Sequence, residues 1–242
     1  MINEIDLPKA VGSSYKHAYP FPYIVIDNFI DEYMVDRARQ ELKSFNHWEM
    51  DLNAYVINEQ VNKEFAPNCF NEQSMHNFRT HASITSMIID YLYSPPALRY
   101  LEELTGIPDL LGDPDVMGGG VHRIHRGGRL AIHADFNWQP KRQMWRRINL
   151  LLYLNKDWQS EWAGELELWD KDLSKCCVKV LPIFNRAVIF NITDDAYHGH
   201  PQPLNTPEGV TRDSIALYYY TLDRPEHEKA PFHPVLWQKL NQ

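Results

Sequence analysis

The sequence predicts a mainly β fold, an antiparallel sandwich or barrel with a helical N-terminal half packed against its outside. From about residue 117, short runs rich in β-branched and aromatic residues follow one another, and turn residues such as Gly164, Pro182 and Asn185 lie between them. Many short strands separated by turn residues are typical of sandwiches and barrels. We expect strands at 120–125, 129–134, 147–154, 165–170, 177–181, 186–192 and 214–221.

The first half of the chain shows helical spacing instead. Residues 22–30 predict one short buried strand, and Asp31 is placed to cap the helix that follows it. Residues 46–72 have no clean period, so we expect an irregular segment that forms part of a wall facing the substrate. Apolar spacing and stop residues predict helices over 32–45, 73–93 and 96–105.

No linker rich in Gly, Ser or Pro divides the chain, so we expect a single domain over residues 1–242. Within it, residues 1–116 are expected to be mostly helical or irregular and residues 117–222 to form the β core. Residues 223–242 are expected to be a C-terminal extension.

The composition excludes several classes of partner. The net charge of -8 and the pI near 5.7 argue against general binding to nucleic acid or to anionic membranes. No apolar run approaches the roughly 18 residues that span a bilayer, and the N-terminus shows no signal-peptide pattern. Cys69 and the adjacent pair Cys176 and Cys177 favour reduced thiols in a cytoplasmic protein. The oligomeric state is not predicted.

His133, Ala134 and Asp135 form the first chemical signal. Side chains at alternate positions of a strand point to the same face, so the imidazole and the carboxylate project together while Ala134 points away. A metal site needs such convergence. A His-x-Asp triplet also arises by chance, so it predicts little on its own.

A later histidine can complete the site. A predicted strand ends near Asn191, a turn follows, and His198 comes next. Two histidines and one carboxylate on a β scaffold make the facial triad of non-haem iron(II), which leaves three coordination positions open. His200 is the rival ligand, but Pro201 restricts its backbone to extended conformations, so we favour His198.

Arg212 and Ser214 are the third signal, because they share one face at the start of the run IALYYYT. A buried guanidinium pairs with a carboxylate through two hydrogen bonds, and a neighbouring hydroxyl adds a third. The pair suits the distal carboxylate of 2-oxoglutarate. A surface Arg at the start of a strand is common, so this interpretation depends on the upstream metal ligands.

In this order and spacing the motifs resemble the Fe(II)/2-oxoglutarate-dependent dioxygenase superfamily, and most of all its prolyl 4-hydroxylase-like branch. The resemblance covers roughly residues 117–222, with a similar lead-in at 21–30. The segments that carry it are GGRLAIHADF at 127–136, RRINLLLYLNKDW at 146–158, AGELELWD at 163–170, FNRAVIFNITDDAYHGHP at 184–201 and RDSIALYYYT at 212–221.

The resemblance implies a double-stranded β-helix, a jelly-roll or cupin-like core with flanking N-terminal helices. It implies that His133, Asp135 and His198 are the catalytic iron(II) ligands and that Arg212 binds 2-oxoglutarate, with Ser214 fitting an Arg-x-Ser pattern found in some members. Dioxygen is then the second cosubstrate, and ascorbate is left open as an accessory reductant.

The chain departs from many prolyl hydroxylases at one point. Those enzymes place a Tyr before His-x-Asp as a ligand of the cosubstrate, whereas here the stretch reads His122-Arg123-Ile124-His125. His122 or His125 could substitute for that Tyr. Alternatively, Tyr153 on the neighbouring strand could reach the cosubstrate.

Hydroxylation of an unactivated C–H bond is the expected reaction, because Asp135 leaves no coordination site for a halide. Desaturation and cyclisation stay open. The missing Tyr and the compact size favour a small-molecule substrate, with release of succinate and CO2. One alternative is a prolyl hydroxylase that acts on a protein or peptide, and another is a non-catalytic, cupin-like metal- or ligand-binding protein.

Seven Lys and Arg residues lie within 121–147, where Asp135 is the only acid. They are either outward-facing, solvated positions or a sign that the 137–147 loop borders the site. In the second case Arg142 and Arg146 would attract an anionic or carrier-bound substrate.

Overall fold

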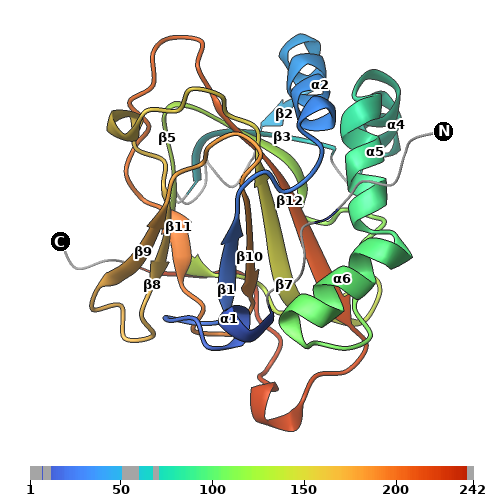
Figure 1. Cartoon of the computed structure of the whole chain (residues 1–242), viewed down its shortest axis with the longest axis vertical. Coiled ribbons are helices and arrows are strands. Elements are labelled where there is room, and N and C mark those ends of the chain that lie inside the picture. Colours follow the sequence, from blue (N-terminus) through green and yellow to red (C-terminus); the bar gives the residue numbers. More distant parts are fainter. Residues whose placement is uncertain (1–6, 8–11, 51–59, 68–70, 239–242) are drawn as a thin grey trace.

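A folded antiparallel sheet forms the core of the computed structural model, which describes residues 7, 12–50, 60–67 and 71–238 (Figure 1). The strands are β1 (Tyr23–Ile26), β2 (Glu49–Met50), β3 (Gln60–Ala66), β4 (Leu111–Gly112), β5 (Gly120–Ala134), β6 (Trp138–Gln139), β7 (Met144–Tyr153), β8 (Leu166–Trp169), β9 (Cys176–Val180), β10 (Ala187–Asn191), β11 (His198–His200), β12 (Arg212–Thr221) and β13 (Leu236–Trp237).

The main strand order is β1-β10-β7-β12-β5-β11-β8-β9, and β3 and β13 pair with β5 outside this path. The long strand β5 therefore joins the two parts of the sheet, with β12 and β7 on one side and β11, β8 and β9 on the other (Figure 1). This arrangement confirms the predicted class, a jelly-roll core with flanking N-terminal helices.

The helices cover one face of β7, β10 and β12 (Figure 1). Alternate residues of these strands, such as Leu150, Ile189 and Leu217, are buried in one apolar core with the helical residues Val35, Leu42, Ile88 and Leu101. The opposite face of the same strands carries apolar residues such as Val188 and Phe190 together with polar residues such as Asn149 and Ser214, and the cavity described below lies on this face. The helices are α1 (Gly12–Lys16), α2 (Glu32–Ser44), α4 (Glu72–His81), α5 (Ser83–Leu92) and α6 (Pro95–Thr105).

The helix ends follow the predicted caps. Asp31 accepts a hydrogen bond of 3.0 Å from the backbone N–H of Met34 at the start of α2. Gly106 ends α6 in the left-handed region, at φ +72°. The single helix predicted over 73–93 is wrong, because Ala82 leaves helical geometry at φ -125° and ψ 50° and divides it into α4 and α5.

Two predictions about the strands also need correction. The strands predicted at 120–125 and 129–134 are one continuous strand, β5. Part of the segment 46–72, which was predicted to be irregular, forms β3. Most residues of β3 pair with β5. Residues 51–59 and 68–70 of that segment lie outside the described residues, as does Cys69.

In the part of the chain that the structure describes, none of the helices has the length and apolarity needed to cross a membrane. The single domain over 1–242 and the cytoplasmic location stay predictions.

Candidate metal and cosubstrate site

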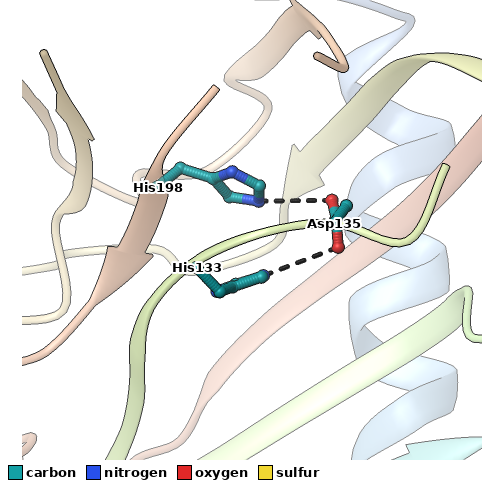
Figure 2. Close-up of side chains that lie close together, drawn as sticks. All are labelled: His133, Asp135 and His198. Carbon is teal, nitrogen blue, oxygen red and sulfur yellow. Dashed lines mark ion pairs between the residues drawn. The ribbon is translucent and has the colours of Figure 1, made fainter. Parts of the chain in front are cut away.

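His133, Asp135 and His198 converge on one point (Figure 2). His133 lies at the C-terminal end of β5 and Asp135 directly follows that strand, and His198 on β11 is the register partner of His133. Nε2 of His133 is 3.5 Å from Oδ1 of Asp135, and Nε2 of His198 is 3.3 Å from Oδ2. The three ligand atoms lie within 4.8 Å of one another, and all three residues are buried.

The backbone fixes both imidazoles with Nε2 toward the carboxylate. Nδ1–H of His133 donates to the carbonyl of Ala131 at 2.8 Å, and Nδ1–H of His198 donates to that of Ala196 at 2.9 Å. This tautomer leaves each Nε2 with a free lone pair. Burial, with His198 as the next cause, lowers the pKa of His133 and keeps its imidazole neutral. Two nitrogen donors and one oxygen donor in this arrangement fit iron(II).

A buried pair of side chains holds the carboxylate of Asp135. Arg146 Nη2 and Asn149 Nδ2 each donate to its Oδ2 at 2.8 Å, and Arg146 Nε donates to Asn149 Oδ1 at 3.0 Å. The guanidinium carbon also lies 3.4 Å from the ring centroid of Tyr218. Burial alone would raise the pKa of Asp135, but Arg146 and the two imidazoles outweigh it and hold that pKa well below its usual range.

Arg212 lies at the start of β12 and is buried. Its Nε donates to the carbonyl of Gly164 at 2.8 Å, and its Nη2 donates to the hydroxyl of Tyr153 at 3.3 Å. Ser214 is the register partner of Tyr153. Burial raises the pKa of Tyr153, so its hydroxyl stays protonated and can donate to an anion. A guanidinium and two hydroxyls therefore come together, as a distal carboxylate requires.

A cavity of about 290 Å³ joins the metal-ligand group to Arg212 and Ser214. Val235 and Trp237, from the C-terminal segment, close one side of it. The ring of Trp237 lies 4.9 Å from that of His133, and its backbone pairs with His133 in the register of β13.

The three residues proposed to replace the missing Tyr have different positions. His122 lines the cavity, and its Nε2–H donates to the carbonyl of Gly118 at 3.1 Å. His125 points elsewhere and lies 2.8 Å from Glu64. The hydroxyl of Tyr153 accepts a hydrogen bond from Arg212, so Tyr153 stays the candidate on the cosubstrate side. His200 also lines the cavity, but it is not one of the three residues whose side chains converge as possible metal ligands.

The cations of residues 137–147 do not form an anion-attracting loop. Lys141 and Arg142 both pair with Asp115, and Arg147 pairs with Glu228. The expectation that Arg146 attracts an anionic substrate is wrong, because its guanidinium is fully buried beside Asp135.

Strand alternation predicts the wrong face of β7 for the side chain of Arg146. It would place Arg146 on the same face as Ile148, which is in the helix-covered core. The register shifts instead, so that Tyr219 pairs with Ile148 while Tyr220 pairs with Arg146. This irregularity turns Arg146 to the face of Asn149. The one sequence signal for this position of Arg146 is that a buried Asp135 carboxylate needs a cation beside it.

The double-stranded β-helix, the metal-ligand group and the buried Arg212 are the features that the resemblance to 2-oxoglutarate-dependent oxygenases implied. Residues 119–220 match the model of the 2OG-Fe(II) oxygenase superfamily. Over these residues the chain is similar to oxygenases that use iron(II) and 2-oxoglutarate, and its buried donor set of two histidines and one carboxylate fits the same metal.

A sequence relative and two solved structures are similar to the chain. It is 24% identical over 220 residues to prolyl 3,4-dihydroxylase OGFOD1 of Ostreococcus tauri, which covers 85% of this chain and 39% of that protein. The chain thus spans well under half of that relative's length. A prolyl 4-hydroxylase of Phytophthora capsici superposes with a TM-score of 0.53 at 18% identity, covering 82% of this chain and 58% of the other. HygX of Streptomyces hygroscopicus, with nickel, 2-oxoglutarate and hygromycin B bound, superposes with a TM-score of 0.54 at 11% identity. This match covers 88% of this chain and 92% of the other. These two structures share the fold.

Proposed function

We propose that the chain hydroxylates a prolyl residue of a peptide or protein. The observation that carries the chemistry is the cavity that joins His133, Asp135 and His198 to Arg212. The relative that is a prolyl 3,4-dihydroxylase supports a prolyl substrate. The sequence alone favoured a small metabolite, and this choice now has weaker support than its prolyl alternative. With a net charge of -8, the proposed partner is such a substrate and not nucleic acid or a membrane surface.

His133, Asp135 and His198 would hold iron(II) on one face. When bound, iron(II) supplies the oxidative decarboxylation of 2-oxoglutarate by dioxygen to succinate and CO2, coupled to hydroxylation of a C–H bond. Arg146 and Asn149 hold Asp135 as a carboxylate in one orientation, so the ligand set is formed before the metal arrives.

Arg212, Tyr153 and Ser214 would bind the distal carboxylate of 2-oxoglutarate and so direct its other end toward the metal ligands. Phe136, Leu151 and Trp237 line the same cavity and exclude water from the reacting groups.

The site assignment is tested by anaerobic titration with iron(II) and then 2-oxoglutarate, followed by the visible charge-transfer absorption of the chelate. Asp135→Ala should abolish the absorption and Arg212→Ala should move it to higher 2-oxoglutarate concentration. A folded wild-type protein that binds metal and gives no absorption would contradict the assignment.

The substrate is tested separately, by incubating the enzyme with proline-rich peptides and with candidate metabolites. We expect a prolyl product that is heavier by one oxygen atom, together with an equal amount of succinate. If only metabolites gain oxygen, the prolyl proposal fails and the oxygenase class stands.

A further inference from the structure

The C-terminal segment 231–238 forms part of the wall of the cavity and is attached to the β core at two places. The first is the buried side chain of Asn137. Its Nδ2 donates to the carbonyl of Pro231 at 3.0 Å, and its Oδ1 accepts from the backbone N–H of His233 at 3.1 Å. Nε2 of His233 also lies 3.0 Å from Oδ1 of Asp194. These contacts fix the course of the segment before it reaches the metal ligands.

The second attachment is β13, which pairs with β5 beside the metal ligands. Trp237 is the register partner of His133, and the backbone N–H of Gln238 donates to the carbonyl of Ile132 at 2.9 Å. His133 has His198 as its partner on β11. Residues directly opposite each other in an antiparallel sheet share a face, so the three rings form a row. Ring centroids are 4.9 Å apart for Trp237 and His133, and 4.5 Å apart for His133 and His198.

Trp237 lies at the metal end of the cavity. Arg212 is the register partner of Ile124, in the first half of β5, whereas Trp237 pairs with His133 near the end of that strand. The distal carboxylate of 2-oxoglutarate is assigned to Arg212, so the indole does not adjoin that carboxylate. An indole N–H is a donor only, so Trp237 is not a metal ligand either. The group left to contact its ring is the one whose C–H bond is presented to the metal.

Apolar side chains accompany the indole. Val235 of the same segment and Phe136, which follows Asp135, line the cavity together with Trp237. A flat aromatic face beside apolar side chains suits a ring that lies against it, and aromatic-lined grooves are a common way to bind proline-rich segments. A saturated five-membered ring is nearly flat and has few rotatable bonds, so it loses little conformational freedom when it packs there.

We infer that Trp237 is a specificity-determining residue whose indole face packs against a saturated ring of the primary substrate. This inference rests on the proposed function, in which that ring is the pyrrolidine of a prolyl residue. The attachments at Asn137 and β5 hold the indole in register with His133. A ring packed on the indole is therefore positioned with a C–H bond toward the metal ligands.

The test uses the protein loaded with manganese(II), which does not support turnover, and with 2-oxoglutarate. Calorimetry compares two closed-ring ligands with open-chain counterparts of the same carbon number: N-acetyl-L-prolinamide with N-acetyl-N-methyl-L-2-aminobutanamide, and cyclopentanecarboxamide with 2-ethylbutanamide. In the wild type each closed ring should bind roughly tenfold more tightly than its counterpart. The advantage that comes from the rigidity of the ligand alone is common to all variants. Trp237→Leu should therefore reduce the preference to about twofold, and Trp237→Phe should retain most of it.

Trp169→Phe is the matched control, because the indole of Trp169, at the end of β8, donates to Glu167 and not into the cavity. The affinities of every variant for manganese(II) and 2-oxoglutarate are measured first, and they should equal those of the wild type. If Trp237→Leu does not fold, Trp237→Met takes its place, since the unbranched thioether side chain adapts to the same space.

Two outcomes would overturn the inference. One is a wild type that shows no preference for the closed rings, or a preference that Trp237→Leu leaves unchanged. The other is a Trp237→Leu protein whose manganese(II) affinity falls while the ring preference persists, since Trp237 would then serve only to hold β13 against β5. A preference that depends on Trp237 for the cyclopentane pair supports the inference even if no prolyl compound is hydroxylated, in which case the proposed function alone fails.

Discussion

Arg146 and Asp135 form a buried ion pair at 2.8 Å, and the oxygen of Asp135 that accepts from Arg146 is the one that lies 3.3 Å from Nε2 of His198. The carboxylate is thus held beside two imidazoles by a cation whose guanidinium lies against Tyr218 and Phe136. Arg146 and Asn149, which are not among the three residues that would hold the metal, therefore fix the orientation of Asp135.

Replacing Arg146 by Met should lower the affinity for manganese(II) or iron(II) by roughly 10- to 100-fold, because Asp135 loses the partner that orients it. Titration calorimetry of the metal measures this effect. Arg142→Met, which removes an exposed cation paired with Asp115, is the control and should leave metal binding unchanged. A folded Arg146→Met protein with wild-type metal affinity would show that Asn149 alone positions the carboxylate.

Replacing Arg212 by Met should raise the KM for 2-oxoglutarate by roughly 100-fold, because a charge-assisted contact to the distal carboxylate is lost. Tyr153→Phe should raise it by several-fold. The control is a ligand: 2-oxobutyrate lacks the distal carboxylate, so its binding to the manganese(II) enzyme should not change. Equal losses for both oxoacids would place Arg212 elsewhere than at the distal carboxylate.

Gly199 lies between the two histidines of β11, where the strand packs closely on β5. A Cβ atom there would lie 2.6 Å from the carbonyl oxygen of Ala131 and 2.9 Å from that of Leu130. Gly199→Ala should therefore push β11 away from β5, lower the Tm by roughly 3–10 °C and weaken metal binding through His198. Gly209→Ala, with nothing within 4 Å of the new Cβ, should leave metal affinity intact. Unchanged metal binding in Gly199→Ala would mean that β11 adapts without moving its ligand.

Asp36 on α2 forms an ion pair with Lys156, which lies shortly after the end of β7. Hydrogen bonds from Lys156 and Arg39 lower the pKa of Asp36 to about 2. A depressed carboxyl pKa stabilises the fold above the unfolded pKa near 4, and this contribution is lost as the pH falls toward 2. Asp36→Asn should thus lower the Tm at pH 7 by roughly 1–3 °C, and the difference from wild type should vanish near pH 2. A Tm difference that does not change with pH would contradict this assignment.

The fold class and the residues that make up the candidate site could be read from the sequence, because each depends on a short local pattern. His133 and Asp135 share a strand face by alternation, and Arg212 and Ser214 do so by the same rule. The caps at Asp31 and Gly106 are equally local. His198 was favoured from its place after a predicted strand and a turn, but its pairing with His133 is a long-range contact that no local pattern predicts.

Sequence reasoning missed two buried cations, Arg146 and the cavity-lining Lys63 of β3, for two different physical reasons. The sequence QVNKEFA of β3 has no clear alternation, so tertiary pairing with β5 decides its conformation. Arg146 depends on a register irregularity in β7, which no periodic pattern contains. Each is a cation in a stretch whose sequence is typical of a surface strand, and its burial depends on how the strands pair.

His133 and His198 are register partners on two strands, and β11 has only three residues. An ion bound by both histidines would act as a cross-link between β5 and β11. Ligands that bind only the folded state stabilise it by mass action. The melting temperature of this protein should therefore rise with the fraction of it that holds metal. Scarcity of iron would then shorten the lifetime of the protein in addition to any effect on the proposed activity.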